Sequence, residues 1–569
     1  MTTETQERIA FWKSTEFDAE TRNEVAMLEA QDPVLLEDSF YKNLSFGTGG
    51  LRGEMGVGTN RMNQYIVSMA TQGLADYLKK QFDQGISVAI AYDSRNRSTE
   101  FARRAAEVLS ANGIEVYLSK ELRPTPLLSY AVRHLACQAG IVITASHNPK
   151  EYNGYKVYWE DGGQLVPPHD QGIISCVREV TSPSKVKSAV NEALIHPIPD
   201  KVEESYYRHL EELLLLPKDD THKAGLKLLY TSLHGTGITM IPEALKRAGF
   251  HNVDILDSQA EPNGDFPTVD SPNPEERSAM KFALEKGEEL GSDFIIGTDP
   301  DTDRVGIGIR NAQGELELIN GNQAAALLIH FLLENLSEDK KQNGFIAKTI
   351  VTSDLLKDMA DAHGVPCYET LTGFKYIAEL IRLHEGKKTF IGGGEESYGY
   401  LVGDHVRDKD AVISTVMLCE MAAWARSKNT RAQGLLAEIY SRYGLYREAL
   451  VSLVKKGKSG AEEIQSIMEG FRSDPPTELA GTPIVQLIDY QRSMSYDLRT
   501  RASERIELPK SNVIQFLLED GSKVTARPSG TEPKIKYYLS VKEELNGNLD
   551  SAWKRAGERI RAFETALGL

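Results

Sequence analysis

Short runs of apolar residues alternate along the chain with longer segments whose apolar positions recur every three or four residues. Ser87–Tyr92 (SVAIAY) is short and mostly apolar, as a buried strand is. Glu100–Asn112 (EFARRAAEVLSAN) has helical spacing and is followed by Gly113, after which Ile114–Leu118 again has a strand pattern. A strand, a helix and a second strand in this order predict a parallel, right-handed unit.

The same order of elements occurs twice more. Leu226–Tyr230 precedes a helical segment and the strand pattern Phe294–Gly297. Gly344–Val351 precedes a helical pattern at Ser353–His363. We therefore expect three α/β domains of similar design, which are alike in pattern and not in residue identity.

The C-terminal part of the chain follows a different order. Val513–Leu518, Lys523–Arg527 and Lys536–Val541 have strand patterns, and the long helical segment Asp550–Leu567 comes last. Strands followed by one long helix predict a small α+β domain.

Polar segments that carry proline or glycine separate these blocks. They lie near Pro197–Lys201, near Arg310–Gly314 and around Lys455–Gly460. We therefore predict four domains, at residues 1–203, 204–313, 314–455 and 456–569.

Composition places the chain among ordinary globular proteins. Its 569 residues are 41% hydrophobic and 26% charged. The net charge of −17 argues against a nucleic-acid-binding surface, although a local cluster of Arg and Lys can still bind an anionic substrate. The four cysteines lack CxxC spacing, which is typical of a reduced cytosolic chain without a disulfide framework or structural zinc.

Neither a signal peptide nor a membrane span is predicted. The N-terminus (MTTETQER) is polar and acidic, and the longest apolar candidate, Ala324–Leu333, is too short for a bilayer and includes His330. We expect a cytoplasmic protein that binds neither membrane nor nucleic acid.

The first candidate site is Thr144-Ala-Ser-His-Asn-Pro-Lys150, which follows a strand pattern ending at Ile143. Asn148-Pro149 predicts a turn. A serine at the carboxyl end of a strand in an open α/β sheet lies where ligands bind, so Ser146 is a candidate functional residue. The alternative is a polar turn in which Ser146 makes only a local hydrogen bond.

The second candidate site is a run of alternating aspartates, Asp299, Asp301 and Asp303, directly after a predicted strand. A loop can turn three carboxylates toward one point, where they favour a hard divalent cation, Mg²⁺ or Ca²⁺. An EF-hand is excluded because Arg304 and Arg310 occupy positions that require Gly and Glu. A D-x-D-x-T/V aspartyl-nucleophile motif is excluded because Asp303 occupies its fifth position. The competing interpretation is a solvated acidic turn, which the alternation at a strand end disfavours.

The third candidate site is Phe390-Ile-Gly-Gly-Gly-Glu-Glu-Ser-Tyr-Gly399. Three glycines allow the backbone to approach a ligand closely, and Glu395 and Ser397 then offer acceptors suited to sugar hydroxyls. A tight turn between a strand and a helix, with Ser397 as a cap, explains the same residues equally well.

The fourth candidate site is Ala526-Arg-Pro-Ser-Gly-Thr-Glu-Pro-Lys534. Hydroxyls, backbone N–H groups and two flanking cations are typical of a phosphate-binding turn. A weaker signal is Phe46-Gly-Thr-Gly-Gly-Leu-Arg-Gly53, where a glycine-rich backbone presents Arg52. The chain contains neither a GxGxxG nor a Walker A pattern, so a nucleotide-binding fold is not indicated.

These motifs, in this order, resemble those of the α-D-phosphohexomutase superfamily, the phosphoglucomutases and phosphomannomutases. The similarity is greatest to long bacterial phosphoglucomutases and to phosphoglucomutase-2/phosphopentomutase-like enzymes, and it runs from about Phe46 to about Tyr538. Three further segments belong to it: Ser232-Leu-His-Gly-Thr-Gly237, Asp270-Ser-Pro-Asn-Pro-Glu275 and Leu371-Thr-Gly-Phe-Lys375.

The resemblance implies a fold of three similar mixed-sheet α/β domains and a C-terminal α+β domain around a central cleft. The four predicted domains would then carry a phosphoserine loop (1–203), a metal site (204–313), a sugar-binding loop (314–455) and a phosphate-binding loop (456–569).

The resemblance also implies roles for individual residues. Ser146 would be the phosphorylated serine, and Asp299, Asp301 and Asp303 would bind Mg²⁺ together with its phosphate. Arg304, Arg52, His147 and Lys156 would lie near the reacting phosphate. Glu395 and Ser397 would bind sugar hydroxyls and Lys375 the sugar. The distal phosphate would be held by Arg527, Ser529, Gly530, Thr531 and Lys534.

Relatives commonly have Gly where Pro300 and Thr302 stand, so this loop is expected to be stiffer with its ligands unchanged.

The implied reaction interconverts glucose 1-phosphate and glucose 6-phosphate through a phosphoserine enzyme and glucose 1,6-bisphosphate. Glu396, between the two sugar-binding residues, resembles the glucose-type enzymes. Phosphopentomutase and phosphomannomutase activities are the alternatives, and a non-catalytic sugar-phosphate-binding paralogue is a more remote one. His147, Lys156 and His405 are candidate proton carriers, and for each a structural or phosphate-contacting role is an equal alternative. We expect a monomer or a weak homodimer.

Overall fold

The computed structural model describes residues 1–46, 49–455, 457–529, 534–545 and 548–569. The chain forms two compact units. The first consists of Met1–Gly321, Phe374–Gly392 and Ser397–Asn429, and the second of Asn322–Gly373, Gly393–Glu396 and Thr430–Leu569. The four-domain boundaries stay a prediction.

The first sheet of the first unit is mixed, with the strand order β1-β5-β4-β2-β3-β6. Strands β4, β2, β3 and β6 are parallel neighbours, which confirms the predicted parallel unit, whereas β5 pairs antiparallel with β4 and with β1. The strands are β1 (Gly50–Glu54), β2 (Ser87–Tyr92), β3 (Glu115–Leu118), β4 (Ala139–Ile143), β5 (Tyr152–Trp159) and β6 (Ile195–Pro197).

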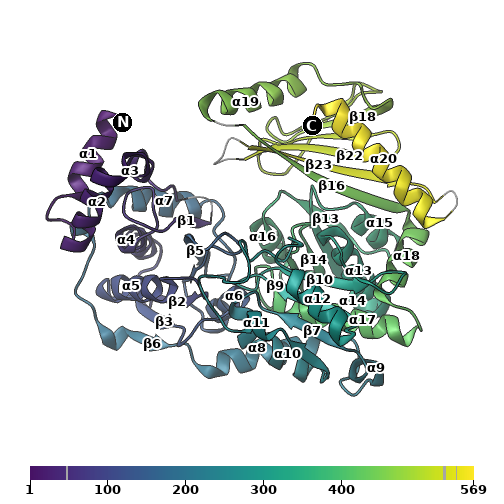
Figure 1. The fold of residues 1–569 in the computed structure, drawn as a ribbon, viewed down its shortest axis with the longest axis horizontal. Helices are drawn as coiled ribbons and strands as arrows, with labels where there is room; N and C mark the ends of the chain where they lie inside the picture. The colour runs from purple at the N-terminus through teal and green to yellow at the C-terminus, as the bar shows by residue number, and fades with distance from the viewer. Residues whose placement is uncertain (47–48, 456, 530–533, 546–547) are drawn as a thin grey trace. The chain divides into compact units, whose positions relative to one another are not determined.

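Helices cover this sheet and bury its apolar residues in one core (Figure 1). Helix α5 begins two residues before the predicted start, at Ser98, whose hydroxyl donates to Asp93 Oδ1 over 2.8 Å. The helices are α4 (Gln64–Gln81), α5 (Ser98–Ala111), α6 (Thr125–His134) and α7 (His169–Glu179).

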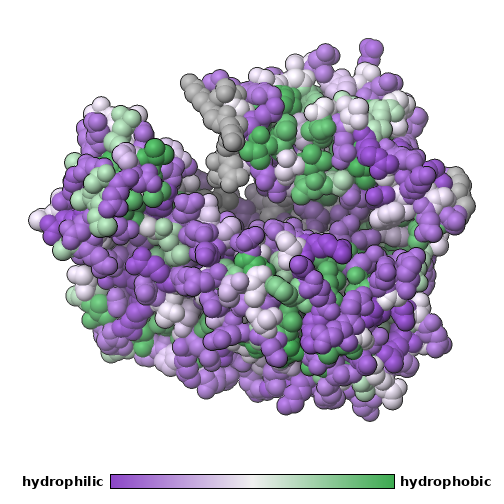
Figure 2. Space-filling model, viewed as in Figure 1, coloured by the Kyte–Doolittle hydropathy of each residue, from purple (hydrophilic) through white to green (hydrophobic). Residues whose placement is uncertain are grey.

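Three helices precede the first sheet, α1 (Thr3–Trp12), α2 (Ala19–Gln31) and α3 (Pro33–Phe40). They enclose a small aromatic core in which the rings of Trp12 and Phe17 stack with centroids 4.4 Å apart. Val34 remains 81% exposed, and Figure 2 shows green hydrophobic residues among the purple ones over these helices.

The second sheet of the first unit has the order β11-β10-β9-β7-β8 and is also mixed. Its strands are β7 (Leu228–Thr231), β8 (Val253–Ile255), β9 (Phe294–Thr298), β10 (Val305–Arg310) and β11 (Leu316–Leu318). The helices of this part are α8 (Asp200–Leu213), α9 (Thr221–Ala224), α10 (Ile241–Arg247), α11 (Asp257–Ala260), α12 (Lys281–Leu290) and α17 (Ala411–Ser427).

A third sheet has the order β13-β12-β14-β15, and its strand β14 runs from the first unit into the second. Its strands are β12 (Gly344–Thr349), β13 (Cys367–Thr370), β14 (Thr389–Gly394) and β15 (Tyr400–Val402). The helices are α13 (Gly321–Asn335), α14 (Glu338–Gln342), α15 (Leu355–Ala362), α16 (Phe374–His384) and α18 (Ala432–Tyr443).

The C-terminal sheet belongs to the second unit, and all its recorded pairs are antiparallel. Its order is β16-β23-β22-β21-β18-β19-β20, with β17 paired to β18. Helix α20 (Leu549–Leu567) packs on β23 and β16, as Figure 1 shows, and α19 (Gly457–Ser473) contacts β23. The strands are β16 (Leu445–Val454), β17 (Glu478–Leu479), β18 (Thr482–Asp489), β19 (Met494–Asp497), β20 (Ser503–Arg505), β21 (Ile514–Leu518), β22 (Lys523–Pro528) and β23 (Lys534–Glu543).

The predicted fold class is confirmed: mixed-sheet α/β architecture is followed by a C-terminal sheet with a long final helix. Among the described residues, no helix is long and apolar enough to cross a membrane.

Candidate active site

Ser146 lies three residues after the end of β4 and is buried, with 3% of its surface exposed. Its φ of +53° is in the left-handed region, which a residue with a Cβ rarely adopts. The backbone N–H of Ser146 donates to the hydroxyl of Thr144 over 2.8 Å. A strained serine that is held from both sides points to a functional loop.

Arg95 fixes the backbone of this loop through hydrogen bonds. Its guanidinium donates to the carbonyl oxygens of Ser146 (2.6 Å), Pro149 (2.8 Å) and Tyr152 (3.0 Å) and also to that of Asn148. Arg95 is itself buried, with 3% of its surface exposed. A planar fork with several donors fixes the backbone of the loop more rigidly than a single donor could.

The three aspartates lie on the turn between β9 and β10, and each is buried. One carboxylate oxygen from each lies within 4.8 Å of the others. Ser146 Oγ donates to Asp299 Oδ2 over 2.9 Å, although 153 positions separate the two residues. The structure therefore brings together the first two candidate sites predicted from the sequence.

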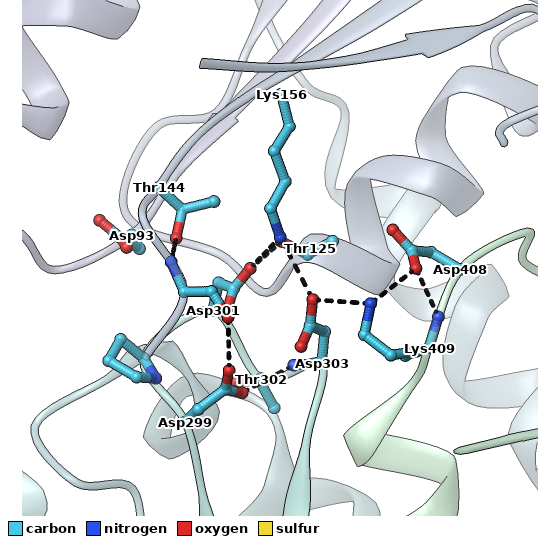
Figure 3. A network of polar contacts seen from close by, with 12 residues as sticks. Asp93, Thr125, Thr144, Lys156, Asp299, Asp301, Thr302, Asp303, Asp408 and Lys409 are labelled. Carbon is cyan, nitrogen blue, oxygen red and sulfur yellow. Dashed lines mark hydrogen bonds and ion pairs between the residues drawn. The ribbon is translucent and has the colours of Figure 1, made fainter. Parts of the chain in front are cut away.

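Two lysines neutralise part of this negative charge. Lys156, on β5, places Nζ 2.7 Å from Asp301 Oδ2 and 3.2 Å from Asp303 Oδ2. Lys409 places Nζ 3.2 Å from Asp303 Oδ2 and 3.2 Å from Asp408 Oδ1. Figure 3 shows both lysine side chains pointing toward Asp303 from different elements.

The oxygens that remain suit a bound cation. Thr125 donates its hydroxyl to Asp301 Oδ2 over 2.9 Å, so this oxygen is already used. The other oxygens, Asp301 Oδ1 and Asp303 Oδ1, are buried and accept no hydrogen bond from any described residue. A buried carboxylate oxygen without a donor is costly, and a hard cation that binds carboxylates would satisfy it. The residues present therefore fit a divalent metal ion.

The pKa values of the aspartates reflect this crowding. Burial, followed by the charges of Asp301 and Asp303, raises the pKa of Asp299 well above its usual value. Burial alone would also raise the pKa of Asp303, but Lys409 and Lys156 hold it far below its usual value. The lysines thus keep one carboxylate ionised, whereas a second needs further positive charge to ionise fully.

His147 follows Ser146, and its surroundings favour the neutral ring. Its Nδ1 lies 3.2 Å from Ser146 Oγ. Burial, followed by the charges of Arg304 and Arg52, lowers the pKa of His147 well below its usual value. Ring nitrogen and hydroxyl are close enough to exchange a proton.

Two arginines that we expect near the reacting phosphate contact residues of neighbouring loops. Arg304 forms an ion pair with Glu275, and Arg52 donates to Asn148 Oδ1 over 3.0 Å. The backbone N–H of Arg304 also donates to Asp299 Oδ1 over 3.0 Å.

The segment Asp270–Glu275 also reaches the serine loop, because the Ser271 hydroxyl donates to the carbonyl of His147 over 3.1 Å.

His405 is held by a group of polar residues in the first unit. Its Nε2 lies 3.1 Å from Asp410 Oδ2, and Asp410 also accepts from the hydroxyl of Tyr206 over 2.7 Å. Lys375 is the second residue of α16, and burial lowers its pKa. Roles in proton transfer for His405 and in sugar binding for Lys375 stay predictions.

The glycine-rich segment includes the end of β14. Glu395 and Glu396 belong to the second unit, and Ser397 belongs to the first. A Cβ on Gly393 would lie 1.9 Å from the carbonyl oxygen of Ala347, so this glycine is required by packing against β12. Glu395 Oε1 accepts from the backbone N–H of Gly373 over 2.9 Å.

The predicted phosphate-binding segment lies at the end of β22 and the start of β23 in the second unit. Arg527 pairs with Lys536 across these strands, and the N–H of Ser529 donates to the carbonyl of Lys534 over 2.7 Å. Gly530 and Thr531 lie outside the described residues.

Sequence reasoning missed four residues that surround the serine and the aspartates: Arg95, Thr125, Glu275 and Lys409. Glu275 lies within a segment that the sequence analysis had noted, and Lys409 follows Asp408 shortly after the glycine-rich segment. Neither Arg95 nor Thr125 belongs to any noted motif, so only the tertiary structure identifies them.

Three family models match the chain in succession. They are those of phosphoglucomutase/phosphomannomutase alpha/beta/alpha domains I, II and III, which match residues 43–184, 204–314 and 320–443.

Curated relatives match over nearly the whole length. A phosphoglucomutase of Staphylococcus aureus (strain MRSA252) is 39% identical over 518 residues, which cover 90% of this chain and 92% of the relative. A phosphoglucomutase of Staphylococcus haemolyticus (strain JCSC1435) is 37% identical over 517 residues, which cover 90% and 93%.

Two solved structures share the fold. The pp63/parafusin phosphoglucomutase of Paramecium, in its open form, has a TM-score of 0.67 at 18% identity, covering 93% of this chain and 95% of its own. A phosphoglucomutase/phosphomannomutase family protein of Burkholderia thailandensis has a TM-score of 0.66 at 17% identity, covering 92% and 97%.

Proposed function

Because the chain belongs to the phosphoglucomutase/phosphomannomutase family, we propose that it interconverts glucose 1-phosphate and glucose 6-phosphate. Membership of the family confirms the resemblance inferred from the motifs and makes the protein an enzyme of the isomerase class. The observation that carries the proposal is the hydrogen bond from Ser146 Oγ to Asp299 inside a buried group of three aspartates.

Asp299, Asp301 and Asp303 are the residues that would hold Mg²⁺, since carboxylate oxygens are the ligands it prefers. When bound, Mg²⁺ supplies positive charge that neutralises the transferring phosphoryl group. Lys156 and Lys409 offset part of the carboxylate charge, and with Asp408, which also pairs with Lys409, four carboxylates and two lysines leave two negative charges for one divalent cation to balance.

Ser146 is the proposed carrier of the phosphoryl group. The 6-hydroxyl of glucose 1-phosphate attacks the phosphorus on Ser146, the bond from phosphorus to Oγ breaks, and glucose 1,6-bisphosphate forms. The bisphosphate then reorients in the site and transfers its 1-phosphoryl group to Ser146. Glucose 6-phosphate is the product that remains and is released. Arg95 holds the carbonyls of the serine loop, so the position of Oγ is the same at both transfers.

At each transfer the attacking hydroxyl loses a proton and the departing oxygen gains one; the departing oxygen is Ser146 Oγ in the first transfer and the 1-oxygen of the sugar in the second. His147 is neutral and lies beside Ser146 Oγ, so its ring nitrogen is a candidate acceptor. Lys156 is a weaker candidate, because Asp301 and Asp303 outweigh burial and raise its pKa. His405 remains a third candidate, with Asp410 fixing its ring.

Glu395 and Ser397 are proposed to bind the sugar hydroxyls, with Lys375 as a further sugar contact. Arg527, Ser529, Gly530, Thr531 and Lys534 are proposed to hold the phosphate that is not being transferred. That phosphate is on C1 in one half-reaction and on C6 in the other, so the group that binds it has to recognise phosphate more than sugar.

The test is a coupled assay with glucose, mannose and ribose 1-phosphates as substrates and glucose 1,6-bisphosphate as activator. We expect the highest kcat/KM for glucose 1-phosphate, in agreement with Glu396 between the two sugar-binding residues. A higher value for ribose or mannose 1-phosphate would establish the alternative activity. Absence of turnover with all three, in a protein that still binds glucose 6-phosphate, would establish a binding paralogue.

A further inference from the structure

A group of four charged residues in the second unit connects β12, α15 and the C-terminal sheet. Lys348 places Nζ 2.7 Å from Asp354 Oδ1 and 2.6 Å from Glu369 Oε1. Lys523 places Nζ 2.9 Å from the same oxygen of Asp354. We call these four residues the Asp354 cluster. Its two lysines and two carboxylates balance in charge.

Asp354 is the shared member of this cluster, because both lysines bind one of its oxygens. Lys348 is fully buried and Lys523 is 5% exposed, so each depends on its carboxylate partners. Burial alone would raise the pKa of Asp354, but Lys348 and Lys523 hold it below its usual value. Removal of the Asp354 carboxylate would leave Lys523 without the ion-pair partner that it has among the described residues.

One side of the cluster supports the proposed sugar-binding loop. Lys348 also donates to the carbonyl of Thr352 over 3.2 Å. The hydroxyls of Thr349 and Thr352 donate to Glu396 Oε2 over 3.3 and 3.2 Å. Glu396 is the residue next to Glu395. The turn after β12, which Lys348 holds through the carbonyl of Thr352, therefore also holds the Glu395–Glu396 segment of the second unit.

The other side supports the proposed phosphate-binding strand. Lys523 is the first residue of β22, and Arg527 lies four residues further along the same strand. Gln515, on the adjacent strand β21, adds a second connection, since its Nε2 donates to the carbonyl of Ile350 over 2.7 Å and to Thr525 Oγ1 over 2.9 Å.

The two supported segments also act on each other electrostatically. Burial, followed by the charge of Glu395, raises the pKa of Glu396 to about 7, and the charge of Arg527 opposes this shift. Burial, followed by the charge of Glu396, raises the pKa of Tyr538, on β23, to about 12, and the charge of Arg527 opposes this shift. The charges of Glu396 and Arg527 are therefore near enough to interact.

We propose that Asp354 is a positioning residue for both substrate-binding segments, fixing the spacing between the Glu395–Glu396 turn and Arg527. This inference rests on the proposed function, because it assumes that the two segments bind one sugar phosphate. A single carboxylate that accepts from Lys348 and Lys523 couples the turn after β12 to the strand that carries Arg527. The sugar hydroxyls and the distal phosphate are then recognised at a fixed separation.

The experiment compares Asp354→Asn with Asp358→Asn. Asp358 is a matched control within α15, the helix whose N-cap is Asp354, because among the described residues its hydrogen bonds and ion pairs join it to Lys542 over 2.8 Å and to Tyr446 over 2.7 Å, outside both segments. We expect Asp354→Asn to raise KM for glucose 1-phosphate at least tenfold, and Asp358→Asn to change it less than threefold at a similar thermal midpoint. Equal changes in KM would show a merely structural role and overturn the proposal.

Hydrogen exchange gives a readout that needs no activity. In Asp354→Asn, the amides of Gly393–Glu396 and of Val524–Ser529 should exchange at least tenfold faster than in the wild type, and in Asp358→Asn they should not. Lys523→Gln removes only one connection, so it should accelerate exchange in Val524–Ser529 and leave Gly393–Glu396 unchanged. Unchanged exchange in both segments of Asp354→Asn would overturn the proposal. This result does not depend on whether the substrate is a glucose phosphate.

A double-mutant cycle with Arg527→Ala separates positioning from general damage. If Asp354 acts through Arg527, the tenfold effect of Asp354→Asn on KM should shrink below threefold in the Arg527→Ala background. Full additivity of the two effects would contradict that route. Failure of the wild type to turn over any sugar phosphate would reject the proposed function, whereas the exchange experiment would still decide the inference.

Discussion

Ser146 Oγ lies 2.9 Å from Asp299 Oδ2, so the proposed carrier of the phosphoryl group contacts the proposed metal site directly. The two residues come from the ends of strands in different sheets of the first unit. Loss of the hydroxyl and loss of the carboxylates should nevertheless have separable effects on phosphoenzyme formation and on metal binding.

Ser146→Ala removes the proposed carrier of the phosphoryl group. We expect kcat to fall by several orders of magnitude, since removal of a catalytic nucleophile costs up to about 10⁶-fold. Mass spectrometry after incubation with glucose 1,6-bisphosphate should show one added phosphoryl group in the wild type and none in the variant. Binding of glucose 6-phosphate, measured by calorimetry, should change little. Substantial turnover by a variant freed of contaminating mutase would contradict the assignment.

Asp301→Asn should weaken metal binding, because Asp301 Oδ1 is a buried oxygen that the described residues leave without a donor. We expect the concentration of Mg²⁺ for half-maximal activity to rise at least about tenfold, a loss of about 1.4 kcal/mol. Chelation should inactivate the wild type reversibly, and Zn²⁺ should restore activity poorly because it favours nitrogen and sulfur ligands in tetrahedral geometry. Full activity of chelated wild type would rule out the role.

Arg95→Lys tests the fixation of the serine loop. Lysine keeps the charge but cannot reach four carbonyl groups with a planar fork, so the left-handed conformation at Ser146 should relax. We expect kcat to fall at least about tenfold with KM nearly unchanged, as for a group that acts on the reacting atom and not on substrate binding. A change confined to KM would indicate a different role.

Glu395→Gln and Arg527→Ala should have different kinetic signatures. Glu395 is proposed to bind sugar hydroxyls, so its substitution should lower kcat/KM more for glucose than for ribose phosphates. Arg527 is proposed to bind a phosphate common to all substrates, so its loss should cost each of them about 1.5–3 kcal/mol. The same substrate panel is run on both variants. A reversed pattern, with Arg527→Ala altering the ranking of sugars, would show that the roles are exchanged.

Glu448→Gln should stabilise the protein in a pH-dependent way. Burial, followed by the nearby charge of Asp354, raises the pKa of Glu448 to about 7, while Ser353 and Lys523 oppose the shift. A carboxyl whose folded pKa is raised contributes stability below its unfolded pKa of 4.5, and that contribution is lost as pH rises through about 7. Gln does not ionise, so the gain of the variant should grow from pH 5 to pH 8, by up to about 3 kcal/mol.

Denaturant midpoints of wild type and Glu448→Gln at both pH values provide the measurement. An identical gain at pH 5 and pH 8 would mean that Glu448 does not titrate in this range.

The parts of the fold that could be predicted are those encoded locally. Ser87–Tyr92 is a strand with the predicted bounds, because a short apolar run at the centre of a sheet leaves few alternatives. The aspartate turn could also be predicted, because its three carboxylates are close together in the chain. The N-terminal helices were not predicted, because their aromatic core forms only when Trp12 and Phe17 meet.

The parts of the site that were missed depend on tertiary structure. Lys409 reaches Asp303 from 106 positions further along the chain, and Thr125 reaches Asp301 across 176 positions. No local pattern distinguishes these residues from other lysines and threonines. The conformation of Ser146, with its positive φ, was also not predictable, because Arg95, which binds the carbonyl of Ser146, lies 51 positions earlier in the chain.

Strand β16 has a consequence for dividing the chain into fragments. All ten of its residues, Leu445–Val454, pair with β23, which lies at Lys534–Glu543. A fragment ending at the predicted boundary of 455 would keep β16 and lose its partner, exposing a long unpaired edge that invites aggregation. It would also separate Lys523 from Asp354. Expression of a trimmed protein should therefore retain both strands or omit both.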